Sequence, residues 1–155
     1  MSVAKLVQIS VNPKGGVPKF RVESAKLGFE RVEGDKQNHL KFHGGPTRAV
    51  SLFSLELIEA LQAEGHPIEA GTTGENLTIS GLDWDEIKPG VKLQVGEALL
   101  EITKYAQPCK QIVDSFADKD STRIAQKQHS GWSRLYAKVL QEAVVHEGDE
   151  VLVLK

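Results

Sequence analysis

The chain has few of the residues that cross-link a fold or anchor it in a membrane. Its 155 residues include one cysteine, one methionine and 6% aromatic residues. A lone thiol cannot form an intramolecular disulfide, and a single cysteine without further ligands cannot build a structural zinc site. The N-terminal stretch 1–8 has no long apolar run behind a basic segment, which argues against a signal peptide and a membrane span. We therefore expect a cytoplasmic protein, because a reducing compartment suits an unpaired thiol.

The charge balance excludes further classes of protein. The formal net charge is -2, with 26% charged and 40% hydrophobic residues, so the overall basic character of a nucleic-acid binder is missing. No P-loop, dinucleotide fingerprint, nucleophile elbow or zinc-ligand spacing occurs. The length suits one domain over residues 1–155. We expect neither a nucleic-acid partner nor a membrane partner.

Strand patterns are more frequent than helix patterns. Val7, Ile9 and Val11 alternate with polar residues, and similar alternation occurs over 91–95, 98–102 and 135–139, with a last apolar run at 151–154. Gly96 followed by Glu97 fits a type II′ hairpin turn between two of these strands. Many short strands with few helices indicate a mainly β fold of the α+β kind, closer to a barrel than to a doubly wound sheet.

One helix has clear signals at both ends. Ser54 can cap its N-terminus, Leu55, Ile58 and Leu61 repeat at helical spacing, and Gly65 marks its end. Shorter helices are predicted to begin near residue 109 and to run over 121–127.

A first candidate for chemistry is the glycine-rich loop over residues 42–50. It contains His43, Gly44, Gly45 and Arg48. Paired glycines allow a backbone to approach a ligand closely, and an arginine can hold a phosphate or carboxylate through two parallel hydrogen bonds. The alternative is an ordinary tight turn with a solvated arginine.

A second candidate is the polar stretch over residues 71–79. Gly74, Glu75, Asn76, Leu77 and Thr78 lie in it, just before an apolar strand. Successive amides in such loops can form an anion-binding nest, and Asn and Thr side chains can fix a polar heterocycle. The glutamate could pair with a cation such as the arginine of the first loop. An ordinary surface loop remains the alternative.

The third candidate is the single cysteine, Cys109. As a thiolate it could carry a second sulfur, attack an electrophile, or ligate a soft metal centre that brings its other ligands with it. Lys104 and Lys110 are near in sequence, and their positive charge favours a thiolate. A buried, unreactive cysteine is the alternative.

In this order, the His43-Gly44-Gly45-Pro46-Thr47-Arg48 loop, the Gly74-Glu75-Asn76-Leu77-Thr78 loop and Gln107-Pro108-Cys109 resemble the MOSC family, named for the C-terminal domain of molybdenum cofactor sulfurase. The tail, Gly131 to Leu140 followed by Glu147 to Val151, is similar to the closing segment of that family. The resemblance spans nearly the whole chain and implies a MOSC-type β-barrel. It also implies a cleft in which the loops gather around the cysteine.

The resemblance also implies a function and a set of roles. Cys109 matches the sulfur ligand to molybdenum in a molybdopterin-type cofactor, and the residues of the two loops match positions beside that cofactor. They are His43, Gly44, Gly45, Arg48, Gly74, Glu75, Asn76, Leu77 and Thr78. The expected reaction is reduction of N-hydroxylated or related N-oxygenated compounds, with electrons from an external donor protein.

Two alternatives stay open at this point. In one, Cys109 holds a persulfide as a sulfur carrier, supplied by a separate desulfurase because this chain shows no pyridoxal-phosphate domain. In the other, the domain binds a cofactor or an anion without turnover.

Overall fold

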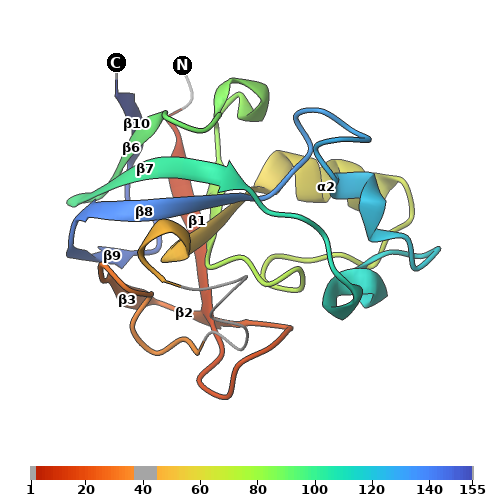
Figure 1. The fold of residues 1–155 in the computed structure, drawn as a ribbon, viewed down its shortest axis with the longest axis horizontal. Coiled ribbons are helices and arrows are strands. Elements are labelled where there is room, and N and C mark those ends of the chain that lie inside the picture. Colours follow the sequence, from red (N-terminus) through yellow and green to blue (C-terminus); the bar gives the residue numbers. More distant parts are fainter. Residues whose placement is uncertain (1–2, 37–44, 155) are drawn as a thin grey trace.

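The structure, a computed structural model, describes residues 3–36 and 45–154 and is mainly β with short helices (Figure 1). The strands are β1 (Lys5–Val11), β2 (Phe20–Val22), β3 (Ser24–Leu27), β4 (Val50–Ser54), β5 (Leu77–Ser80), β6 (Lys92–Val95), β7 (Ala98–Tyr105), β8 (Leu135–Gln141), β9 (Ala143–His146) and β10 (Val151–Leu154). The helices are α2 (Leu55–Ala63) and the 3-10 helices η1 (Pro46–Arg48), η2 (Trp84–Glu86), η3 (Lys110–Ser115) and η4 (Ser121–Ile124). The predicted fold class is confirmed.

Eight of the strands form one sheet, in the order β10-β6-β7-β8-β4-β5-β1-β2, and β3 and β9 form a separate pair. Neighbours are antiparallel except β4 and β5, which run parallel. The sheet curves so that Lys5 of β1 forms an isolated bridge with Glu150, beside β10. No strand ladder joins the two edges over the described residues, so the closed barrel expected from the resemblance is not confirmed.

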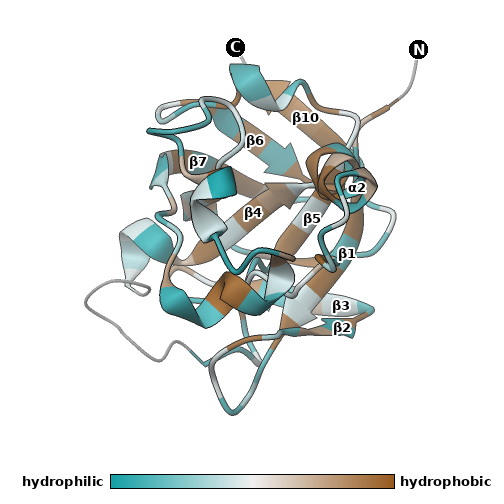
Figure 2. Ribbon diagram, turned by 90° about the vertical axis from the view of Figure 1, so that its right-hand side faces the viewer, coloured by the Kyte–Doolittle hydropathy of each residue, from teal (hydrophilic) through white to brown (hydrophobic). Residues whose placement is uncertain are grey.

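The core lies against the inner face of this sheet. Figure 2 shows the strands β4 and β5 as mostly hydrophobic, with α2 packed close to them. Phe53 of β4 and Phe116, which follows η3, are among the largest fully buried side chains. Ile58 and Leu61 of α2 are also buried. Burial of these apolar surfaces is the main favourable term in the stability of the fold.

The predicted strands and the main helix are confirmed. Ser54 Oγ accepts a hydrogen bond from the Leu57 backbone N–H, as expected of an N-cap. Gly96 takes the positive φ, 55°, that the predicted hairpin turn requires, and Val95 pairs with Ala98 across it. The two shorter helices exist but are 3-10 turns, and the second ends at Ile124 rather than at residue 127. Over the described residues no helix is long and apolar enough to cross a bilayer.

The burial of β1 does not follow one alternation along its whole length. Ile9 and Val11 are buried, yet Val7 is 38% exposed and Leu6 is fully buried. The register against β5 shifts between Leu6 and Gln8, which marks a β-bulge or irregularity. Because a one-residue shift moves side chains to the other face, the alternation changes phase at this point.

Candidate functional site

Loops from distant parts of the chain meet around Cys109. A small cavity of about 70 Å³ is lined by the β1–β2 loop, β4, the loop before β5, the start of η3 and the start of β8. A second cavity of about 530 Å³ lies beside it. Arg48, Cys109 and Tyr136 line both cavities. The three residues therefore stand where a narrow polar pocket meets a wider one.

Cys109 is half-buried and is the N-cap residue of η3, with extended backbone dihedrals. The end of β7 and residues 106–108 lead the chain to it. Ala106 N–H donates to the Arg134 carbonyl oxygen at 2.9 Å, which fixes this segment against the start of β8. Lys104, on β7, lines the wider cavity together with the cysteine. The sulfur is thus reachable from a cavity and is not part of the closed core.

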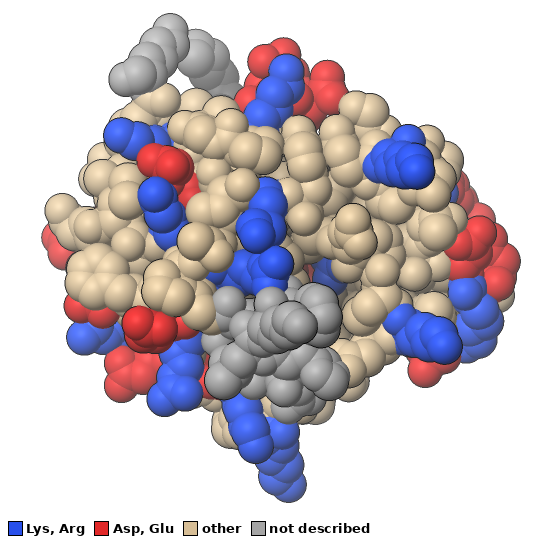
Figure 3. Space-filling view, viewed as in Figure 1, with Lys and Arg blue, Asp and Glu red and all other residues tan. Residues whose placement is uncertain are grey.

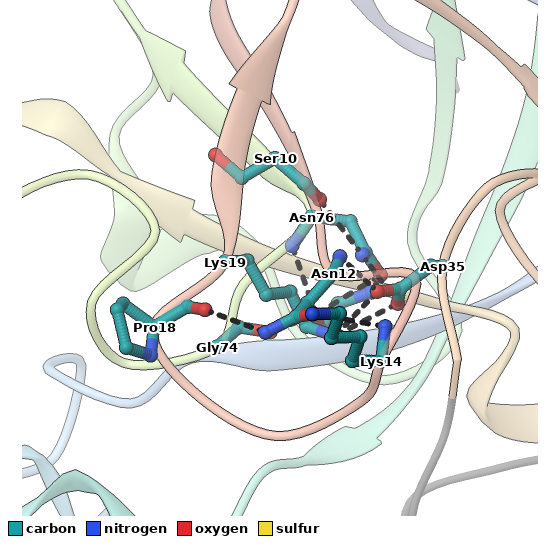
Figure 4. A network of polar contacts seen from close by, with 9 residues as sticks. Ser10, Asn12, Lys14, Pro18, Lys19, Asp35, Gly74 and Asn76 are labelled. Atoms are coloured by element: carbon teal, nitrogen blue, oxygen red, sulfur yellow. Dashed lines mark hydrogen bonds and ion pairs between the residues drawn. The ribbon is translucent and has the colours of Figure 1, made fainter.

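A polar network forms one wall of the small cavity (Figure 4). Lys19 Nζ lies 2.7 Å from Asp35 Oδ1 and 2.8 Å from Oδ2. The same carboxylate accepts from the Asn12 backbone N–H at 2.8 Å and from Asn76 Nδ2 at 3.0 Å. Asn76 Nδ2 also donates to the Ser10 carbonyl oxygen. Each partner of the Asp35 carboxylate in this network is a donor, so the buried carboxylate oxygens are satisfied by hydrogen bonds.

The side-chain oxygen of Asn76 joins the loop before β5 to β4. Ser51 N–H donates to Asn76 Oδ1 at 3.1 Å, and Ser51 Oγ donates to the Gly74 carbonyl oxygen at 3.1 Å. The loop passes close to residues 17–19 as well: a Cβ at Gly71 would lie 2.6 Å from the Lys19 carbonyl oxygen. Side chains and backbone together hold this loop at a set distance from the β1–β2 loop.

Two further charged side chains are buried at the cavity, Arg134 in its lining and Glu75 behind it. Arg134 is 7% exposed, and its Nη1 donates to the Thr73 carbonyl oxygen at 2.6 Å while Nη2 donates to the Gln107 carbonyl oxygen at 3.1 Å. Glu75 is fully buried and accepts from Thr73 Oγ1 at 2.9 Å. Burial raises the pKa of the Glu75 carboxyl, although hydrogen bonds and the Arg134 charge act against this rise.

The electrostatics of the aromatic and cationic groups agree with a desolvated site. Burial lowers the pKa of the Arg134 guanidinium, while Tyr136, Glu75 and Cys109 act in the opposite direction. Burial raises the pKa of the Tyr136 phenol against the effect of Arg134 and Arg48. The Arg48 guanidinium lies over the Tyr136 ring, 5.9 Å from its centroid. The two arginines and the phenol form one coupled group around the sulfur.

The structure places the predicted site residues unevenly. Arg48, Gly74, Asn76 and Cys109 line the small cavity together. Gly45 caps η1 and is not among the residues lining either cavity. Three others are buried below the site and likewise do not line it: Glu75, Leu77 and Thr78. His43 and Gly44 lie outside the described residues. The roles assigned to these residues stay predictions.

Several residues of the site are not predicted from the sequence. They are Lys19, Asp35, Ser51, Thr73, Arg134 and Tyr136, all of which line the small cavity. One signal was present: Arg134 is a charged residue directly before the apolar strand 135–139. A charged residue at such a position either lies in water at the end of the strand or is buried with partners. Arg134 is buried with partners.

The face around the site is basic. Figure 3 shows lysine and arginine side chains near the centre of the face seen in Figure 1, with acidic side chains mostly toward its periphery. The residues lining the wider cavity include Arg48 and Lys104 but no carboxylate. Over residues 3–36 and 45–154, no group of three or more His, Cys, Asp or Glu side chains could hold a metal ion.

Comparisons with known proteins identify the family of the chain. The MOSC domain matches residues 39–152 of the chain. The chain is 30% identical over 141 residues, 90% of its length, to the uncharacterized protein YflK of Bacillus subtilis. It is 28% identical over 134 residues, 81% of its length, to the protein YiiM of Escherichia coli. It covers 63% and 60% of these two relatives, so both are considerably longer.

The fold is also found among solved structures. The crystal structure of YiiM from Geobacillus stearothermophilus superposes with a TM-score of 0.72 at 25% identity, covering 98% of this chain and 75% of that one. YuaD from Bacillus subtilis gives a TM-score of 0.74 at 19% identity and is covered over 94% of its length. The second likeness concerns the fold alone.

Proposed function

We propose, since the chain belongs to the MOSC domain family, that it binds a molybdenum cofactor at the Cys109 pocket with the cysteine thiolate as the protein's ligand to the metal. Members of this family are associated with that cofactor. The observation that carries the proposal is the position of the chain's single thiol, at the junction of a narrow cationic cavity and a wider one.

The residues of the site fit such a group. The cofactor brings dithiolene sulfurs and oxygen ligands to the metal, so the protein has to add one soft thiolate. Arg48 and Arg134 supply positive charge for an anionic ligand, and the Asn76 amide and Gly74 backbone offer polar contacts on the cavity wall. Lys19 is already paired with Asp35 and completes that wall.

Bound at this site, the cofactor would supply two-electron redox chemistry suited to breaking an N–O bond, which supports reduction of N-hydroxylated or related N-oxygenated compounds as the finer proposal. This chain's part is to bind and orient. The wider cavity can admit a substrate beside the sulfur, with Lys104 and Arg48 on its walls. The buried Arg134 and the half-buried Arg48 provide positive charge that is already in place before a ligand binds. Electrons would come from a partner protein.

Purification from a host that makes the molybdenum cofactor tests the proposal. Wild type and Cys109→Ser are compared for molybdenum by elemental analysis, for pterin by fluorescence, and for persulfide by mass spectrometry. Molybdenum near one per chain in wild type, lost in the serine variant, supports the proposal. A persulfide without metal would contradict it and favour a sulfur carrier fed by a desulfurase. Pterin bound equally by both variants would leave only a binding module.

A further inference from the structure

Arg134 is the one cation among the described residues that the fold buries. Removing a guanidinium from water costs several kcal/mol unless its donors find acceptors and its charge finds compensation. Two donors have them: Nη1 binds the Thr73 carbonyl oxygen and Nη2 binds the Gln107 carbonyl oxygen. Nε has no hydrogen-bond partner among the described residues. The fold therefore buries the Arg134 charge at a cost in desolvation free energy, and core packing alone does not explain why.

The two acceptors belong to the two loops that build the pocket. Thr73 lies in the loop before β5, and Gln107 lies two residues before Cys109. The backbone of Arg134 reinforces the second attachment, because its carbonyl oxygen accepts from Ala106 N–H at 2.9 Å. Ser133 Oγ also contacts the Ala106 carbonyl oxygen, at 3.3 Å. One residue thus ties the cysteine segment to the opposite wall of the cavity.

The charge on the same side chain is only partly compensated. Lys19 and Asp35 cancel each other within their own ion pair. Glu75 interacts with Arg134, but its carboxyl is fully buried, which raises its pKa, and it is not among the residues that line the cavity. Arg48 adds a second positive charge to the cavity lining. Over the described residues, three cations and one carboxylate line the small cavity beside the sulfur, so its lining carries an excess of positive charge.

We propose that Arg134 is the positioning residue of the Cys109 pocket: its guanidinium clamps the loop that carries the thiol and makes the pocket attract anionic groups. The ligand class is a carboxylate, a phosphate or another oxyanion group. The catalytic meaning of this role rests on the proposed function. Its test does not, because the reactivity of the single thiol can be measured without any cofactor.

The experiment compares alkylation of Cys109 by anionic iodoacetate and by neutral iodoacetamide. In both reactions the thiolate displaces iodide. The iodoacetate rate divided by the iodoacetamide rate is therefore independent of how much thiolate is present, and it reports the local charge. The urea-unfolded chain provides the reference ratio for the same thiol in water. One charge acting over about 6 Å in water changes a rate about three-fold. We expect the ratio in the folded wild type to exceed the reference at least about three-fold.

Two variants separate the charge from the clamp. Arg134→Met is expected to lower the ratio about three-fold, with Arg48 still holding it above the unfolded reference, whereas Arg134→Lys, which keeps the charge, retains the wild-type ratio. Both should increase the iodoacetamide rate, since neither side chain can bridge the two carbonyls and the loop is released. Arg123→Lys is the control: that guanidinium binds Glu64 and lies over the Trp132 ring, away from the cavity lining, and both rates should stay at the wild-type value.

A folded wild type with the reference ratio, or Arg134→Met with the wild-type ratio, would overturn the anion-attracting role. An unchanged iodoacetamide rate in Arg134→Lys would overturn the clamp. If Arg134→Met does not fold, the wild-type ratio and the lysine variant still decide both parts. Molybdenum absent from a protein that passes these tests would refute the proposed function alone.

Discussion

Lys19 and Asp35 form an ion pair of 2.7 Å, and their side chains are 10% and 3% exposed. Both residues line the small cavity that Cys109 also lines. Removing one partner of such a pair leaves an uncompensated buried charge. We expect Asp35→Ala to lower the free energy of unfolding by about 3–5 kcal/mol, measured by urea denaturation. The same carboxylate also binds Asn12 and Asn76, so the β1–β2 loop loses its attachment as well.

Asp114 provides the control for that measurement. It also pairs with a lysine, Lys119, at 2.8 Å, but its side chain is 88% exposed. Exposed pairs contribute about 0–1 kcal/mol. If Asp114→Ala destabilises the protein as much as Asp35→Ala does, burial is not what makes the Lys19 pair matter.

Gly71 should tolerate no side chain. Its φ is +89°, and a Cβ would lie 2.6 Å from the Lys19 carbonyl oxygen. Gly148 has a similar φ, +92°, with nothing within 4 Å of a Cβ. Both alanine variants pay about 1–2 kcal/mol for the left-handed backbone. Gly71→Ala should lose about 1–3 kcal/mol more through the clash. Equal losses in thermal or urea unfolding would show that the two loops are not in close contact.

Glu75 should make stability depend on pH. Burial raises its pKa in the folded protein above the unfolded value, so the folded state holds the proton more tightly. The stability that this proton provides is present at pH below about 4.5 and is lost as pH rises through the folded-state pKa. Glu75→Gln keeps a neutral side chain at every pH. The free energy of unfolding of the variant, minus that of wild type, should therefore increase with pH above this point.

Urea unfolding of both proteins at several pH values checks this sign. Glu59→Gln, on the exposed side of α2, controls for the loss of one acidic residue. A difference that stays constant with pH, or that decreases, would contradict a raised pKa at Glu75.

Local sequence patterns predicted those elements of the fold that depend on residues close together in sequence. Ser54 and the spacing of Ile58 and Leu61 predicted α2, because capping and periodicity act within a few residues. The bulge after Leu6 was not predictable, since it is defined by the pairing with β5 more than seventy residues away.

The site divides in the same way. Cys109, Arg48, Gly74 and Asn76 were predicted and lie together. Arg134 was not, because its acceptors Thr73 and Gln107 are 61 and 27 residues away and are backbone carbonyls, which leave no mark on side-chain composition. Residue type predicted the candidate thiol, while the groups that surround it depend on topology.

Arg48 offers the last test, on the cofactor itself. It lines both cavities at the sulfur and lies against Tyr136, on the short 3-10 helix before β4. Because its charge is expected to act on an anionic ligand, Arg48→Ala should reduce molybdenum and pterin retained through purification about ten-fold. Unfolding free energy should change by less than about 1 kcal/mol, as its side chain is not fully buried. Arg31→Ala, an exposed arginine outside both cavities, should retain the wild-type content. Equal retention by both variants at matched stability would remove Arg48 from the cofactor site and leave Arg134 as its main source of positive charge.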